Sequence, residues 1–164
     1  MGGNTKITDE LYESEDILFT CQVSKQNRLG MWQKRSLLLT NQRLCNLCDS
    51  DFKRSIELSK IKALTKNIKK GNTSDFLVHV DGEYDYRFIS NQREAIFKHI
   101  RESLFSFTTG ELPIYGVDGG IEKYITKAKD RIKSQAKGLP PQEYRLYGDD
   151  AVNVVEASAT ERML

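Results

Sequence analysis

The chain has 164 residues, of which 29% are charged and 38% hydrophobic, which is typical of a soluble globular domain with its own core. No apolar run reaches the roughly 20 residues that a membrane-spanning helix needs, and the polar start of the chain lacks the apolar segment of a secretory signal. Three cysteines are too few for a disulfide scaffold, so the sequence favours a cytoplasmic protein.

The net charge of +2 conceals an uneven distribution of charge along the chain. Residues 1–20 carry one base and five acids, residues 24–71 carry twelve bases and three acids, and residues 122–137 carry six bases and two acids. Such blocks indicate charged partners rather than a particular fold. A solvated protein face is the alternative interpretation of the same blocks.

The first half of the chain has the alternating apolar pattern of short antiparallel strands. Residues 1–14 lack any periodicity and predict a flexible acidic arm. Beyond them, every second residue is apolar over short stretches separated by polar turns. Strands are predicted at residues 16–24, 32–40, 44–49 and 54–58, and residues 61–65 are expected to continue the fourth strand.

The pattern continues through a hairpin and then changes to a helical period. Residues 76–80 and 84–90 alternate as strands, with Asp81-Gly82 between them as a two-residue hairpin signal. Ser90-Asn91 can cap a helix, and Glu94 follows Asn91 by three residues, like a capping box, so a helix is predicted from there to a point before Thr109.

The last third of the chain predicts an appended helix and a tail. Residues 112–116 read as extended. Residues 119–136 have apolar residues at helical spacing and predict an amphipathic helix that ends before Pro140-Pro141. Residues 142–164 are polar and predict a tail.

Four pieces of this pattern, at residues 32–40, 40–44, 54–61 and 75–100, together resemble the pleckstrin-homology (PH) domain. The variant that it resembles most is the PH-like domain of myosin-I tails and of ciliate and apicomplexan membrane-associated proteins. The resemblance covers residues 15–107. It implies a mainly β fold with α: a PH-like bent seven-stranded barrel or sandwich closed by a C-terminal helix, with the amphipathic helix appended.

The resemblance also implies how the chain is divided. The expected parts are a flexible acidic arm (1–14), the PH-like domain (15–108), a linker with the amphipathic helix (109–141) and a polar tail (142–164). Many PH domains carry a tryptophan in the closing helix, where this chain has Ile96 and Phe97.

Lipid-binding PH domains surround inositol phosphates with a lysine near the end of the first strand and two bases on the second. The matching positions here are Lys25, Gln33 and Arg35, so a glutamine replaces one base. Strand alternation places Gln33 and Arg35 on one face and Lys34 on the other. The candidate headgroup-binding residues are Lys25, Arg28, Lys34, Arg35, Lys66, Lys69 and Lys70.

Apolar residues accompany these bases in the first loop. Leu29 and Met31 are candidates for insertion into a membrane, and packing beneath their own loop is the alternative. Gly2 is a candidate for N-myristoylation, although Lys6 stands where the motif has Ser or Thr. Each base near an anionic surface contributes about 1 kcal/mol, so a broad charge-driven contact is a further interpretation.

The sequence carries no pattern typical of catalysis or of a metal site. It has no phosphate-binding glycine loop. Cys45 and Cys48 form a C-x-x-C pair without a second pair, and Cys45 is predicted to lie in the core. His79 and His99 have no nucleophile beside them in the sequence. We expect no enzyme activity, no metal and no cofactor, and nucleic acid is disfavoured because stacking aromatics do not accompany the bases.

The expected function is therefore a peripheral membrane-targeting module that binds phosphoinositide or phosphatidic acid. The alternative is a protein-interaction module acting through residues 119–141, as the regulatory part of a kinase or of a cytoskeletal assembly.

Overall fold

The computed structural model describes residues 10–27, 29–105, 112–125, 145–146 and 154–156. In chain order its elements are β1 (Ile17–Gln26), β2 (Trp32–Thr40), β3 (Arg43–Cys48), β4 (Asp51–Glu57), the 3-10 helix η1 (Leu58–Lys60), β5 (Ile61–Asn67), β6 (Asp75–Val80), β7 (Tyr86–Ile89), helix α2 (Arg93–Phe105), β8 (Ile114–Asp118), the 3-10 helix η2 (Ile121–Tyr124), β9 (Arg145–Leu146) and β10 (Val154–Glu156). Within these described ranges, the mainly β architecture with one long helix confirms the predicted fold class.

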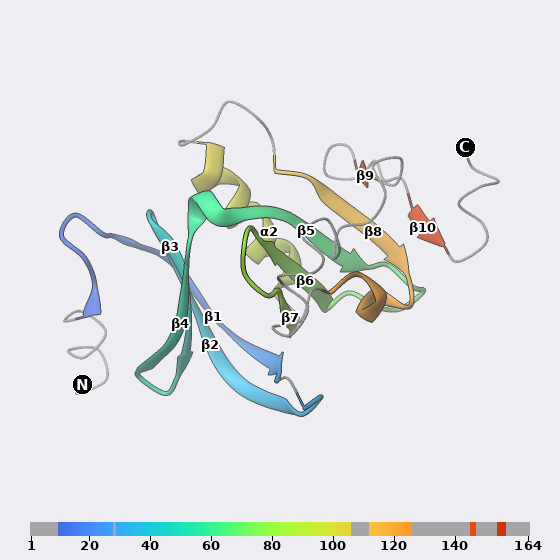
Figure 1. Ribbon diagram of the computed structural model, residues 1–164, viewed down its shortest axis with the longest axis horizontal. Helices are drawn as coiled ribbons and strands as arrows, with labels where there is room; N and C mark the ends of the chain where they lie inside the picture. The colour runs from blue at the N-terminus through green and yellow to red at the C-terminus, as the bar shows by residue number, and fades with distance from the viewer. Residues whose placement is uncertain (1–9, 28, 106–111, 126–144, 147–153, 157–164) are drawn as a thin grey trace.

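The strands form two halves joined through β1. Strands β1 to β4 make an antiparallel meander, and β5 to β7 make a second one. β1 is long enough to pair with β2 along its length and with β7 at its end, where Ser24 lies opposite Ile89. Figure 1 shows β1–β4 at the lower left, β5–β8 to their right, and α2 behind them.

The sheet does not close between β4 and β5. Its hydrogen-bonded order is β10-β8-β5-β6-β7-β1-β2-β3-β4, with β9 on β8. The prediction that residues 61–65 continue the fourth strand is wrong, because η1 turns the chain between them and the two strands belong to different halves. The gap between β4 and β5 leaves the two halves as the layers of a bent sandwich rather than as a closed barrel.

One local prediction in the second half is also wrong. The turn between β6 and β7 spans residues 81–85 rather than two residues. Asp85 explains the longer turn, because its carboxylate is buried, accepts from the Val80 backbone N–H at 3.1 Å and lies 2.9 Å from His79 Nδ1. At the start of α2, Ser90 Oγ accepts from the Gln92 N–H at 3.0 Å, in line with the capping role predicted for Ser90-Asn91.

The core lies between the two halves and beneath α2. The helix buries four apolar side chains against the strands (Ile96, Phe97, Ile100 and Leu104). The Phe97 ring meets Phe76 edge-on, with centroids 5.2 Å apart. Cys45 is fully buried in a smaller cluster on the other side of the first half, as predicted. The helix therefore closes one end of the sandwich.

The segment after α2 adds to the second half. β8 pairs in parallel with β5, and η2 places Ile121 against Leu77 and Val117 in a small apolar cluster. The predicted amphipathic helix at 119–136 is wrong for its described part, which is a 3-10 turn preceded by Gly119 and Gly120 at φ of 80° and 66°. Two left-handed residues in succession prevent a helix from starting there. Residues 126–136 lie outside the described part of the chain.

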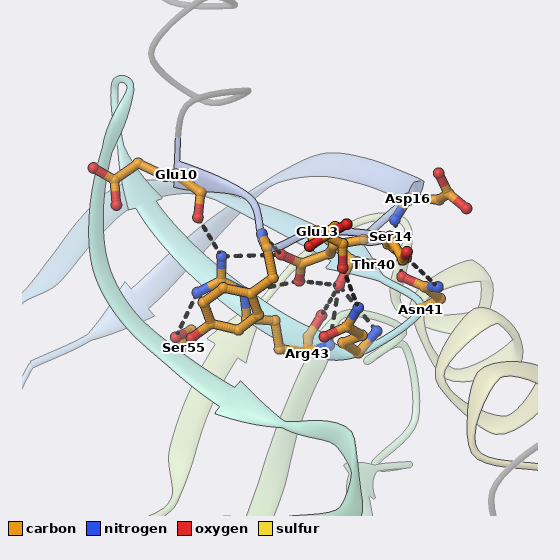
Figure 2. A network of polar contacts seen from close by, with 11 residues as sticks. Glu10, Glu13, Ser14, Asp16, Thr40, Asn41, Arg43 and Ser55 are labelled. Atoms are coloured by element: carbon orange, nitrogen blue, oxygen red, sulfur yellow. Dashed lines mark hydrogen bonds and ion pairs between the residues drawn. The ribbon is translucent and has the colours of Figure 1, made fainter.

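The end of the N-terminal arm is anchored on the first half through one buried arginine. Arg43 Nε donates to Glu15 Oε2 at 2.8 Å, and Arg43 Nη2 donates to Glu15 Oε1 and to the Glu10 carbonyl. Thr40 Oγ1 donates to the same carboxylate at 2.6 Å, and the Tyr12 ring lies 4.0 Å from the guanidinium. Figure 2 shows this arm segment crossing the strands beside Arg43. Residues 1–9 lie outside the described part.

Candidate anion-binding site

Three basic side chains lie on the core-facing side of strands β1, β2 and β4, next to the last apolar residues of that side. Opposite residues of antiparallel strands share a face. Cys21 lies opposite Leu37 in the core, and the next pairs along the same face are Val23 with Arg35 and then Lys25 with Gln33. Sequence alternation therefore correctly predicts that Arg35 and Gln33 share a face.

Arg54 reaches the same region from β4. It lies two residues before the buried Ile56 and so points to the same face. Together, Lys25, Arg35 and Arg54 form what we call the basic cluster. Sequence reasoning missed Arg54, although its spacing from Ile56 carries the signal that would have found it.

Arg54 is held from several sides. Its guanidinium lies 3.8 Å from the Tyr84 ring centroid and 4.3 Å from that of Tyr86. Its Nη2 donates to the Tyr84 carbonyl at 2.8 Å and to Glu83 Oε1 at 3.2 Å. Its side chain is 13% exposed. Stacking on two rings fixes the plane of the guanidinium.

Arg35 is held by its own strand. Its Nη1 donates to the Lys34 carbonyl at 2.8 Å, and its Nη2 donates to Gln33 Oε1 at 3.0 Å. Gln33 stands where the resemblance to PH domains implies a base. Its amide oxygen accepts from Arg35 and so orients the guanidinium.

Lys25 interacts electrostatically with both arginines. Its Nζ is 5.7 Å from the Tyr86 ring centroid. Burial lowers the pKa of Lys25, and the positive charges of Arg35 and Arg54 lower it further. The cluster therefore holds positive charge that its own surroundings do not fully balance.

Several polar atoms of this region are buried with no hydrogen-bond partner among the described residues. They are Arg35 Nε, Arg54 Nη1, the Tyr86 hydroxyl and Asn46 Oδ1. A buried polar group left unpaired costs about 1–3 kcal/mol. Burial raises the pKa of Tyr86, so its hydroxyl stays protonated and can donate. Two guanidinium N–H groups and one hydroxyl are thus donors without a partner, and Asn46 Oδ1, on the residue opposite Arg54, is an acceptor without one.

The other predicted site residues are distributed over different surfaces. Lys34 is exposed on the opposite face of β2 from Arg35. Lys66 is paired with Glu94 at 3.2 Å and is 12% exposed, while Lys69 and Lys70 are exposed on the β5–β6 loop. Arg28 and Gly2 lie outside the described residues, as do residues 126–141 of the predicted partner-binding segment.

The tip of the first hairpin exposes apolar side chains. Leu29 is 80% exposed, Met31 63% and Trp32 40%. Asn27 Oδ1 accepts from the backbone N–H groups of Leu29 and Met31, so the turn is formed without burying either side chain. The alternative that Leu29 and Met31 pack beneath their own loop does not occur.

Comparison with known proteins supports the fold. No family model and no curated protein matches the sequence. Among solved structures, the hSac2 domain of the human phosphoinositide phosphatase Sac2 is 12% identical, with a TM-score of 0.53 over 69% of this chain and 84% of that one. The linker-DH/PH domains of p115-RhoGEF are 10% identical, with a TM-score of 0.50 over 63% of this chain and 33% of that one.

A pleckstrin homology domain solved in solution is 16% identical, with a TM-score of 0.48 over 58% of this chain and 92% of that one. The two structures matched with TM-scores of 0.50 or more give this chain a PH-like fold. These identities establish the fold and nothing narrower, so the resemblance to myosin-I tails stays a prediction.

On the outer face of β7, Arg87 is paired with acidic side chains. Arg87 Nη2 donates to Asp75 at 2.9 Å, and Arg87 Nη1 lies 3.8 Å from Glu122. The Arg87 guanidinium also lies 5.2 Å from the Trp32 ring. Acids beside this arginine make the outer face a poorer anion site than the basic cluster.

The described residues contain no cluster of three or more His, Cys, Asp or Glu that could hold a metal ion. Burial raises the pKa of Cys21 to about 11 and that of Cys45 to about 12, which leaves both as unreactive thiols. In the same described part, no helix is long and apolar enough to cross a membrane.

Proposed function

We propose that this PH-like domain is a non-enzymatic module that binds the phosphate of an anionic phospholipid, phosphoinositide or phosphatidic acid, at the basic cluster. It acts at the periphery of a membrane on the cytoplasmic side. The observation that carries the proposal is the set of buried donors without acceptors on Arg35, Arg54 and Tyr86. A phosphate group supplies several acceptor oxygens and up to two negative charges, which suits such a set.

The exposed hairpin tip supports a membrane as the source of the phosphate. Leu29 and Met31 are carried by the loop that joins β1 to β2, and these strands also carry Lys25 and Arg35. Apolar side chains that enter the headgroup boundary add to the attraction of bases for an anionic surface.

Vesicle binding tests the proposal. We expect co-sedimentation with vesicles containing phosphatidylinositol monophosphate to exceed that with phosphatidylserine vesicles of equal total charge. Arg35→Ala removes a charge-assisted contact of about 1.5–3 kcal/mol and should weaken binding to the phosphoinositide about tenfold or more.

Lys34→Ala is the matched control, because Lys34 is a neighbouring cation on the opposite face. It should weaken binding to both vesicles alike and keep the preference. Equal binding of the wild-type domain to both vesicles, or loss of the preference in Lys34→Ala but not in Arg35→Ala, would contradict the proposal.

Insertion of the hairpin tip is tested separately. Leu29→Ser should weaken vesicle binding about tenfold, since burying a leucine contributes about 1.5–3 kcal/mol. It should leave thermal stability and the affinity for soluble inositol trisphosphate unchanged, because the side chain is already exposed. Leu18→Ser, at a leucine 46% exposed near the start of β1, is the control and should leave vesicle binding intact. Equal effects of the two substitutions would exclude insertion of the tip.

A further inference from the structure

Glu83, in the turn between β6 and β7, places a carboxylate beside the basic cluster. Its Oε1 accepts from Arg54 Nη2 at 3.2 Å, and its Oε2 lies 3.6 Å from Lys60 Nζ. The side chain is 30% exposed, and its position in a turn lets it rotate toward water.

Arg54 does not need Glu83 in order to stay in place. The same Nη2 donates to the Tyr84 carbonyl at the shorter distance of 2.8 Å, and the guanidinium stacks on both Tyr84 and Tyr86. A carboxylate that only positioned Arg54 would therefore be redundant. What Glu83 adds is a negative charge beside Arg54 Nη2. The other terminal nitrogen of Arg54, Nη1, has no hydrogen-bond partner in the part of the chain that the structure describes.

We propose that Glu83 is an internal counter-ion of the basic cluster, which competes with a bound phosphate for Arg54 and thereby keeps phosphate binding weak. This inference rests on the proposed anion site and assigns its regulation. A bound phosphate must either share Arg54 with a carboxylate, which is also negatively charged, or displace Glu83 into water. In both cases the negative charge of Glu83 opposes the ligand.

The competition has a direct test in Glu83→Gln, which keeps the shape and an acceptor oxygen and removes the charge. Calorimetric titration with soluble inositol trisphosphate should show affinity raised about fivefold, the worth of about one surface charge. Glu94→Gln is the matched control, because Glu94 neutralises Lys66 and Arg93 instead of the cluster. It carries the same change of net charge and should alter affinity less than about twofold.

The outcomes separate the inference from the proposed function. If the wild-type domain binds the probe and Glu83→Gln binds it no more tightly than Glu94→Gln does, the counter-ion role is wrong while the anion site stands. If only Glu83→Gln binds, the counter-ion role holds and the wild-type domain is not a lipid-binding module in this state. If neither binds, both proposals fail.

Vesicles identify the source of the phosphate. A gain for Glu83→Gln with both inositol trisphosphate and phosphatidylinositol monophosphate vesicles supports competition at a lipid headgroup site. A gain with the soluble probe alone supports the competition and contradicts a membrane as the source. A gain with the vesicles alone, without one for the soluble probe, would overturn the assignment of Glu83 to the headgroup site.

Discussion

Arg43→Met should lower the free energy of unfolding by about 3–5 kcal/mol, because it leaves a buried carboxylate without its cation. The Glu15 side chain is 0% exposed and the Arg43 side chain 7%. The guanidinium also holds the Glu10 carbonyl and Ser55 Oγ, so its loss releases the arm segment from β3 and β4. Urea unfolding measures the change.

The double-mutant cycle with Glu15→Gln distinguishes the ion pair from lost packing. The two losses should be strongly non-additive, since each substitution removes the same contact. Lys34→Met, at an exposed lysine, is the control for loss of a positive charge and should cost little. A loss for Arg43→Met no larger than that for Lys34→Met would contradict the anchoring role.

Acidification should reveal the same contact. Burial raises the pKa of Glu15, but hydrogen bonds from Arg43, Thr40 and the Tyr12 backbone lower it more, so the net direction is below the ordinary value of 4.5. The folded-state pKa thus lies below the unfolded one. The stabilisation is present above pH 4.5 and is lost as the pH falls through the folded-state pKa. Glu15→Gln should lack this part of the acid sensitivity.

Arg35→Ala combined with Arg54→Met should weaken binding of inositol trisphosphate about a hundredfold or more, which makes it the largest expected change in binding. Each arginine offers a charge-assisted hydrogen bond of about 1.5–3 kcal/mol. Methionine keeps an apolar stem against Tyr84 and Tyr86, where the Arg54 guanidinium stacks.

Lys53→Met is the matched control on β4, because Lys53 is exposed next to Arg54. It should change binding of the soluble probe less than about twofold. A thermal melt of each variant checks that the domain stays folded. A double variant that is folded and still binds as tightly as Lys53→Met would remove the basic cluster from the site.

The strand pattern explains which parts of this site the sequence predicts. Alternation along β2 fixes the faces of Arg35 and Lys34 because the strand is regular and its next residues, Leu37 and Leu39, are core residues. The same rule applies to Arg54, two residues before Ile56. The resemblance to PH domains implies headgroup-binding positions on the first hairpin, whereas Arg54 lies on β4.

Other parts could not be predicted from local pattern. Glu83 contacts Arg54 only because the fold brings the turn between β6 and β7 beside β4. The two residues are 29 positions apart in the sequence. The strand β8 carries no signal that it pairs in parallel with β5. At 119–125 the apolar spacing of a helix is present, but Gly119 and Gly120 take left-handed backbone angles that override it.

The position of Trp32 gives this domain an optical reporter of its own. Trp32 is the single tryptophan of the chain, and its ring lies at the base of the exposed hairpin tip with the Arg87 guanidinium 5.2 Å away. All intrinsic tryptophan emission therefore originates from this hairpin. A change of polarity or of quenching there is visible without a label, and it reports on the hairpin rather than on the core, whose aromatic residues are phenylalanines and tyrosines.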